Sequence, residues 1–208
     1  MPNILGSIDY CFSPGVGKTS DFERELKKIG ITSFLIDGTI NNKLPFEKYE
    51  FDFEPLNLGI IDNKDQITLE SWIKKKKLDE NNNLLLQIDI EGHEIPCILN
   101  APKKTLAQFK IIVLELHFMD ELTSSGVICL NSFFDKFNDL FDICHIHPNN
   151  CCGVTNIYGI KVPNVMEITF LRKDLTFDKK KIEKLPNPLD KKCVSYNKDI
   201  ILDKFFIK

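Results

Sequence analysis

Acidic and histidine side chains stand at the ends of two apolar segments in the middle of this sequence. Asp89 and Glu91 follow the first segment, and Glu115 and His117 close the second. Residues two apart in an extended chain share one side, so each pair is expected to point in one direction. Carboxylates and an imidazole gathered in this way serve proton transfer or bind a polar ligand. The alternative is that the acids only cap the following helix, because carboxylates stabilise helix N-termini.

The two apolar segments are the elements that must position these side chains. The first is the apolar run that opens Leu84–Gly92, a stretch that ends in two acids and a glycine, and the second is Phe109–Leu116. Both predict strands buried on both faces. Such strands belong to parallel α/β sheets, whose ligands bind beyond the carboxyl ends. If the two strands are parallel neighbours, all four polar side chains meet at one edge of the sheet.

The N-terminal segment has the layout of a nucleoside-binding half-domain. Ile8–Phe12 is predicted to be a strand, Gly15 and Gly17 a turn, and Ile31–Ile36 a second strand that ends at Asp37. The glycines let the backbone approach a ligand closely, and the acid, about 20 residues further on, accepts hydrogen bonds from ribose hydroxyls. We therefore expect a nucleoside across the carboxyl ends of these strands.

A helix is predicted between these two strands. Ser20 to Glu23 fits a capping box, in which Ser20 is the N-cap and the Glu23 side chain reaches back to it. Gly30 is a natural stop for this helix.

The C-terminal part of the domain predicts an antiparallel pair at one edge of the sheet. Asn131–Phe141 is expected to be a helix, followed by strands at Asp142–His147 and Val165–Leu171 with no helical pattern between them. His145 and His147 share one face of the first strand. They are expected to donate hydrogen bonds to a polar substrate or to face solvent.

Composition and charge limit the class of protein. The 208 residues suffice for one domain, expected over 1–173, with a surface tail over 174–208 that packs on it. The net charge of -3, mixed along the chain, argues against nucleic acid as a partner. No apolar run approaches the ~18 residues of a membrane span. The seven cysteines lack paired spacing and no signal peptide is seen, which predicts a cytoplasmic protein.

Several segments resemble one enzyme family. Gln87–Glu94 resembles the K-I-D-(V/I)-E-G-x-E core of FkbM-type S-adenosylmethionine-dependent methyltransferases, and Ile67–Trp72 is similar to the T-L-D-x-W/L stretch upstream of it. Tyr10–Glu23 resembles the glycine loop of related members. The closing segment of the family is matched by Ile143–Asn150 and Val162–Leu171. The sequence departs from the family at Gln87, where lysine is usual, and at Ser13-Pro14 in the glycine loop.

The resemblance implies a fold and an activity. The fold is an α/β, Rossmann-like class I methyltransferase sheet of seven mostly parallel strands with an antiparallel final pair. The activity is S-adenosylmethionine-dependent O-methylation of a sugar hydroxyl, on a nucleotide-linked sugar or a precursor of a surface polysaccharide or other glycan. Two alternatives stay open. An NAD-dependent nucleotide-sugar oxidoreductase or epimerase would carry a fuller G-x-G-x-x-G and a Tyr-x-x-x-Lys pair, which the sequence lacks. A non-catalytic nucleoside-binding module would keep only the fold.

These expectations assign roles to individual residues. The cofactor-binding set is Gly15, Gly17, Asp37 and Gly38. The catalytic set is Asp89 near the reacting hydroxyl, His117 as general base, and Glu115, or alternatively Glu91, orienting that base. The substrate-binding set is Glu91, His145, His147 and Asn149. No metal is required by the sequence. A divalent cation, Mg²⁺ or Mn²⁺, on Asp89 and Glu91 is an open alternative, as is a homodimer.

Overall fold

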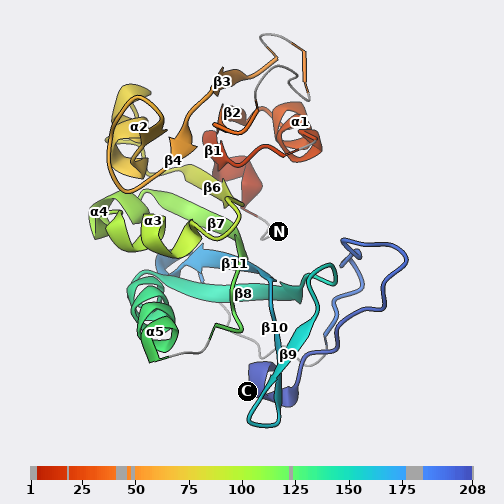
Figure 1. Cartoon of the computed structure of the whole chain (residues 1–208). Helices are drawn as coiled ribbons and strands as arrows, with labels where there is room; N and C mark the ends of the chain where they lie inside the picture. The colour runs from red at the N-terminus through yellow and green to blue at the C-terminus, as the bar shows by residue number, and fades with distance from the viewer. Residues whose placement is uncertain are drawn as a thin grey trace.

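The computed structural model describes residues 4–17, 19–40, 46–47, 50–121, 124–176 and 185–207. Its main sheet has seven strands: β1 (Tyr10–Pro14), β2 (Thr32–Ile36), β3 (Asp52–Glu54), β6 (Leu84–Ile88), β7 (Phe109–Leu116), β8 (Phe141–Pro148) and β11 (Met166–Arg172). Their order across the sheet is β3-β2-β1-β6-β7-β11-β8 (Figure 1). Only β11 runs antiparallel to its neighbours, β7 and β8. The predicted parallel sheet with an antiparallel final pair is confirmed.

Two small strand pairs lie outside this sheet. One pairs β4 (Asn57–Leu58) with β5 (Gln66–Ile67), and the other is a hairpin of β9 (Val154–Ile157) and β10 (Ile160–Pro163). The hairpin occupies the connection between β8 and β11 that was expected to lack a helix.

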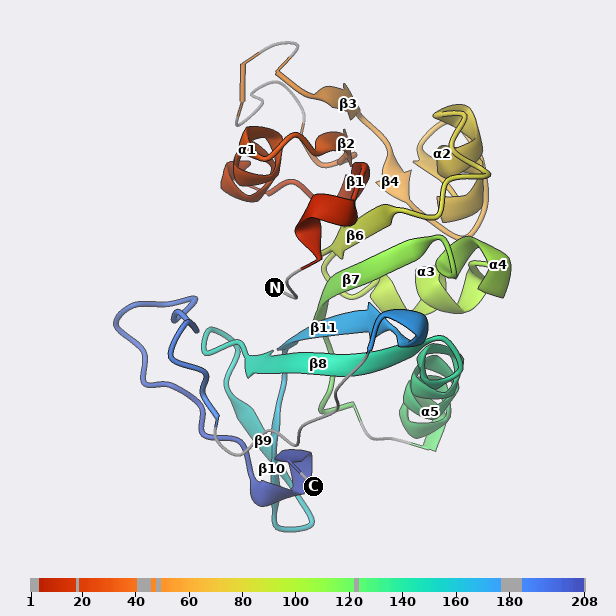
Figure 2. The same cartoon turned by 180° about the vertical axis from the view of Figure 1, so that it is seen from behind.

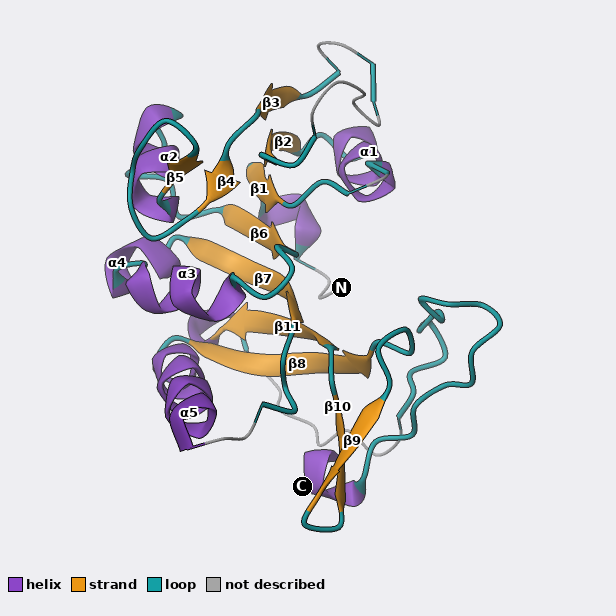
Figure 3. Cartoon of the chain, in the orientation of Figure 1, coloured by secondary structure: helices purple, strands orange, loops and turns teal. Residues whose placement is uncertain are grey.

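Helices cover both faces of the sheet (Figure 3). The α-helices are α1 (Asp21–Lys28), α2 (Leu69–Lys75), α3 (Glu94–Asn100), α4 (Lys103–Leu106) and α5 (Ser124–Asn138), and the 3-10 helices are η1 (Leu5–Ser7), η2 (Lys173–Leu175) and η3 (Lys204–Ile207). Helix α1 packs on one face, and α2 to α5 pack on the other.

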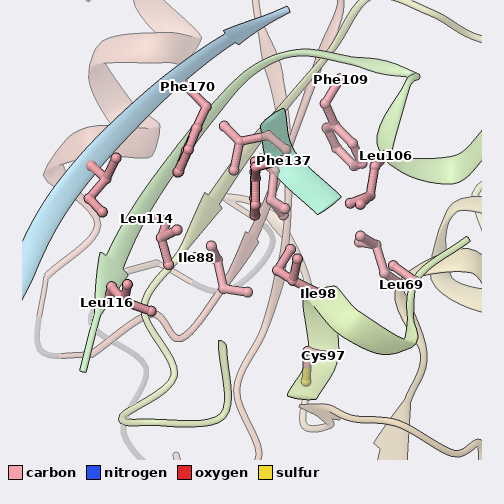
Figure 4. Close-up of a cluster of buried hydrophobic side chains, with 14 of the residues drawn as sticks. Leu69, Ile88, Cys97, Ile98, Leu106, Phe109, Leu114, Leu116, Phe137 and Phe170 are labelled. Carbon is pink, nitrogen blue, oxygen red and sulfur yellow. The ribbon is translucent and has the colours of Figure 1, made fainter. Parts of the chain in front are cut away.

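Strand β6 is buried on both faces because helices pack on each side of the sheet, and none of its leucines is exposed. Leu84, Leu86 and Ile88 belong to the large core under α2 to α5, while Leu85 belongs to the smaller core under α1. In the large core, Ile88 and Leu114 of the sheet face Ile98 of α3 (Figure 4). This packing fixes the point at which β6 and β7 end and their polar residues begin.

Some element boundaries differ from the prediction. The first strand is Tyr10–Pro14, so it begins and ends two residues later than expected, and its end reaches the glycine loop. The helix expected at Asn131–Phe141 is α5, which starts at Ser124 and ends at Asn138. Phe141 instead begins β8 and packs against Phe137 at 5.6 Å between ring centroids, so the aromatic pattern continues across the boundary.

The predicted capping box is wrong. Ser20 is the N-cap of α1 but makes no side-chain capping hydrogen bond, and its buried hydroxyl has no partner among the described residues. The Glu23 side chain points instead to the hydroxyl of Ser13 on β1. A tertiary contact has taken the place of the local one.

Residues 185–207 of the predicted C-terminal tail lie beside the β9–β10 hairpin (Figure 2). Asn150 and Val194 exchange two hydrogen bonds, of 2.8 and 3.0 Å, and Leu202 is buried against the domain. The remainder of the predicted tail, 177–184 and Lys208, lies outside the described residues. Within the described part of the chain, no helix has both the length and the apolar character needed to cross a bilayer.

Candidate active site

The loop between β1 and α1 is held by the buried carboxylate of Asp37 at the end of β2. Its Oδ2 accepts hydrogen bonds from the backbone N–H groups of Val16 at 3.1 Å and Gly17 at 3.4 Å. Its Oδ1 accepts from the amide and hydroxyl of Thr39 at 2.8 and 2.6 Å. The glycine loop and the acid, far apart in sequence, therefore form one preorganised unit.

A cavity of about 790 Å³ opens beside this loop. Its lining includes Gly15, Gly17, Asp37, Gln66, Asp89 and Glu91. The volume lies in the range that small-molecule cofactors occupy. Gly38 does not line this cavity: its N–H donates to Asn57 Oδ1 at 3.2 Å, so it supports the wall rather than the interior.

Gly15 brings the glycine loop against the end of β6. A Cβ atom placed on Gly15 would lie 1.6 Å from the carbonyl oxygen of Asp89, and its φ of +83° favours glycine. The glycine loop and Asp89, the first residue predicted to be catalytic, are therefore in direct contact.

Polar residues that follow β6 and close β7 meet, as the sequence predicts. We call them the acid–histidine cluster: Asp89, Glu91, Glu94, Glu115 and His117. His117 Nδ1 lies 3.2 Å from Glu94 Oε1, and its Nε2 lies 3.4 Å from Glu91 Oε2 and 3.7 Å from Glu115 Oε2. Strand β6 ends at Ile88, and Glu91 has a φ of 55°, so the strand alternation does not reach Glu91. Its side chain is 87% exposed, whereas that of Asp89 is partly buried.

The carboxylates change the charge state of His117. The hydrogen bond with Glu94, helped by the charges of Glu115 and Asp89, raises the pKa of His117 to about 9. Burial opposes ionisation of Glu94, but hydrogen bonds from His117 and from the amides of Ile90 and Gly92 outweigh it and lower the pKa of this acid. At neutral pH the pair is therefore an imidazolium and a carboxylate.

The pKa of Asp89 is raised, whereas the pKa of Glu94 is lowered. Burial, followed by contact with the Glu115 carboxyl, raises the pKa of Asp89 to about 7. Its Oδ1 is buried without a hydrogen-bond partner among the described residues, and its side chain lines the cavity. An acid with this pKa exchanges a proton readily at neutral pH.

A second row of polar side chains crosses β7, β11 and β8 beside this cluster. Glu167 on β11 is in register with Glu115 on one side and His147 on the other. His147 Nδ1 lies 3.4 Å from Glu167 Oε2, and Asn149 Nδ2 donates to Glu115 Oε1 at 2.5 Å. Two of the predicted substrate-binding residues, His147 and Asn149, are therefore near the cluster.

His145 is separated from this row. Its Nε2 lies 3.0 Å from Asp190 Oδ1 of the C-terminal tail. The sequence grouped His145 with His147, and the pairing of β8 with β11 is regular between them, because its bulge lies beyond His145. The two rings differ in partner because the tail brings Asp190 to His145, while Glu167 of β11 meets His147.

The sequence reasoning missed Glu94 as a member of the site. Asp89, Glu94 and His117 each offer one ligand atom, and these three atoms lie within 4.8 Å of one another. Among the described residues, this trio is therefore a group that could hold a cation, and it includes Glu94 in place of the Glu91 expected from the sequence. The missed signal is local: Glu94 begins α3, and its carboxylate accepts hydrogen bonds from the turn that follows Asp89.

The sheet order, glycine loop and cavity define the class of the protein, a Rossmann-like α/β protein with a nucleoside-sized cavity at the ends of its parallel strands. Comparison with protein-family models matches residues 15–145, more than half of the chain, to the Methyltransferase FkbM domain. The chain therefore belongs to the FkbM methyltransferase family, which supports methyltransferase activity. No curated protein matches the chain.

Proposed function

We propose that this protein is an S-adenosylmethionine-dependent O-methyltransferase that acts on a sugar hydroxyl of a nucleotide-linked sugar or a glycan precursor. The observation that carries the proposal is the single cavity that joins the glycine loop to Asp89. A nucleoside cofactor needs the glycine loop, and deprotonation of a hydroxyl needs an acceptor of the proton such as Asp89.

The residues of the cavity fit a nucleoside with an attached amino acid. Gly15 and Gly17 allow close approach of the backbone, and Asp37 presents carboxylate oxygens at the cavity wall. Asp37 already accepts hydrogen bonds from Val16, Gly17 and Thr39. Ribose hydroxyls would therefore share its lone pairs with the groups that shape the loop.

S-adenosylmethionine, when bound, supplies an electrophilic methyl group on a positively charged sulfur. Asp89 is our proposed general base: its Oδ1 is free of a partner among the described residues and takes the proton of the acceptor hydroxyl as the oxygen is methylated. The sequence assigned this role to His117. Because both ring nitrogens of His117 face carboxylates and the pKa of the ring is raised to about 9, the ring has no free site for a proton at neutral pH.

His117 is then a positioning residue. Its positive charge offsets part of the repulsion between Asp89 and Glu115, and so limits how far the pKa of Asp89 rises. His147 and Asn149, beside Glu115, are the groups we propose for hydrogen bonds to other hydroxyls of the acceptor.

A divalent cation on the trio of Asp89, Glu94 and His117 remains an alternative helper. Carboxylate oxygens suit Mg²⁺, but a cation must displace the proton that His117 carries between its acidic neighbours. Turnover measured after treatment with EDTA, and again after addition of Mg²⁺ or Mn²⁺, separates the two cases. Full turnover in EDTA would exclude the cation.

Calorimetry with S-adenosylhomocysteine and with NAD tests the cofactor. We expect binding of S-adenosylhomocysteine alone, weakened at least about tenfold in Asp37→Asn, because one oxygen that accepts hydrogen bonds becomes a donor. Asp21→Asn, which changes an exposed acid on α1, is the matched control and should bind normally. Binding of NAD instead would refute the proposal and favour an oxidoreductase. A screen of nucleotide-linked sugars, with mass detection of a methylated product, then tests the acceptor.

A further inference from the structure

A cluster of three polar side chains lies at one end of the cavity, outside the acid–histidine cluster. Ser13 comes from β1, Glu23 from α1 and Gln87 from β6. Ser13 is completely buried, Glu23 is 4% exposed, and Glu23 and Gln87 both line the cavity. Three elements therefore combine to hold one buried carboxyl group at the cavity wall.

Ser13 connects the other two members of this group. Ser13 Oγ donates to Glu23 Oε1 at 2.5 Å and lies 2.7 Å from the side-chain amide of Gln87. A hydroxyl has one proton, so while Ser13 donates to Glu23 the amide of Gln87 offers its nitrogen to the Ser13 oxygen. Burial raises the pKa of Glu23, and the hydrogen bond from Ser13 opposes part of this increase.

The charged and titratable groups that face Glu23 do not neutralise it. Asp21 and Arg24 lie on the same helix, and Arg24 forms a salt bridge with Glu50 at 2.9 Å. Cys11 on β1 is buried, and burial and the neighbouring Glu23 raise the pKa of its thiol. Within the described ranges no ion pair to Glu23 is formed. The family core usually has lysine at the position of Gln87, and the cation that it would bring to Ser13 and Glu23 is absent here.

We propose that Glu23, held by Ser13 and Gln87, binds the α-ammonium group of the amino-acid part of the cofactor. This inference rests on the proposed function. Methyl transfer at Asp89 requires the sulfur of the cofactor near that residue, and Gln87 precedes Asp89 by two positions, or about 7 Å of extended chain. Three carbon atoms separate the ammonium group from the sulfur, a shorter span than this, and the Glu23 side chain reaches toward Gln87 through Ser13. On binding, the Glu23 carboxylate pairs with the ammonium group, which offsets the cost of a buried charge.

Two ligands distinguish this subsite from a general effect on the cavity. S-adenosylhomocysteine carries the amino-acid group, and methylthioadenosine shares its nucleoside and sulfur but lacks the amino acid. Glu23→Gln should weaken S-adenosylhomocysteine by about 10- to 100-fold, the range of one hydrogen bond to a charged group, and leave methylthioadenosine unchanged. Glu25→Gln, an exposed acid on the same helix, is the control and should bind both ligands normally.

Proton release gives a second readout. Burial raises the pKa of Glu23, and a bound cation would lower it. Calorimetry in two buffers of different ionisation enthalpy, at mildly acidic pH, should therefore detect more proton release by wild type on binding S-adenosylhomocysteine than on binding methylthioadenosine. Glu23→Gln should abolish the difference between the ligands. Because Asp89 and His117 face both ligands alike, the comparison cancels their protons.

Three results would count against the subsite. Equal weakening of both ligands in Glu23→Gln would mean a structural role, and unchanged binding of S-adenosylhomocysteine would mean that Glu23 does not meet a cation. If wild type binds neither ligand, the proposed function itself fails and the subsite fails with it. Retained binding of methylthioadenosine also shows that the variant is folded.

Discussion

Replacement of Glu94 by glutamine tests the charge state on which the proposed mechanism depends. Glutamine keeps an oxygen for the amides of Ile90 and Gly92, which donate to Glu94 Oε1 at 2.9 and 3.1 Å, but removes the charge facing His117. The pKa of His117 should then fall from about 9 toward the ordinary value of 6.5. The variant therefore separates the ion pair from the turn that Glu94 also stabilises.

The expected loss of stability follows from this shift. His117 is 11% exposed, so the interaction is little screened by solvent. The difference between a pKa of about 9 and the ordinary 6.5 corresponds to about 3 kcal/mol, and this is an upper bound for Glu94 because Glu115 and Asp89 also raise the pKa of His117. Because the folded pKa is raised, this contribution is complete below pH 6.5 and is lost as the pH rises through 9. The lowered pKa of Glu94 reports the same pair and is not counted again.

Urea unfolding at several pH values measures this difference. Glu94→Gln should be less stable than wild type by up to about 3 kcal/mol near pH 6 and by much less near pH 9.5, apart from a constant cost for the amide nitrogen that replaces the unpartnered Oε2. NMR of the imidazole protons follows the pKa directly, because the chain has only 4 histidines. Glu91→Gln is the control, since its exposed side chain should change both quantities little. A loss that does not vary with pH, or a His117 that still titrates near 9, would refute the ion pair.

Other changes test other parts of the site. Asp89→Asn should lower turnover by about 100-fold or more, yet raise the melting temperature at pH 8. Ionisation of this acid costs stability as the pH rises from 3.8 to about 7, and the variant removes that cost; a lower melting temperature would contradict the raised pKa. Gly15→Ala should destabilise the fold, measured by thermal melting, because its Cβ would lie 1.6 Å from the carbonyl oxygen of Asp89. Gly17→Ala, where φ is +62° but the space is open, should cost less, and equal losses would contradict the close approach.

The sheet could be predicted where strong apolar runs end abruptly in polar residues. Strand β7 has the predicted bounds, Phe109–Leu116, and β6 begins where expected at Leu84. Both strands are buried on two faces, and this fixes their bounds, because a shift by one residue would expose apolar side chains. Because parallel neighbours align their carboxyl ends, the meeting of Asp89, Glu115 and His117 followed from the strand ends alone.

The contacts of Glu23 could not be predicted because a local motif competed with a tertiary one. The spacing of Ser20 and Glu23 satisfies a capping box. The hydroxyl that Glu23 meets belongs to Ser13 on β1, which also contacts Gln87, 74 positions further along the chain. No spacing rule connects the three residues, since β1 and β6 become neighbours only when the sheet forms.

The proposed exchange of roles between His117 and Asp89 has a similar origin. Histidine is the usual candidate for a base because its ordinary pKa lies near neutrality, and aspartate is ordinarily a much stronger acid. Here the carboxylate of Glu94 raises the pKa of the histidine to about 9, and burial beside Glu115 raises that of the aspartate to about 7. Residue type alone assigns the base to the ring. Once the distances are known, the same electrostatic rules assign it to the acid, because Asp89 combines a pKa near neutrality with a side chain that lines the cavity.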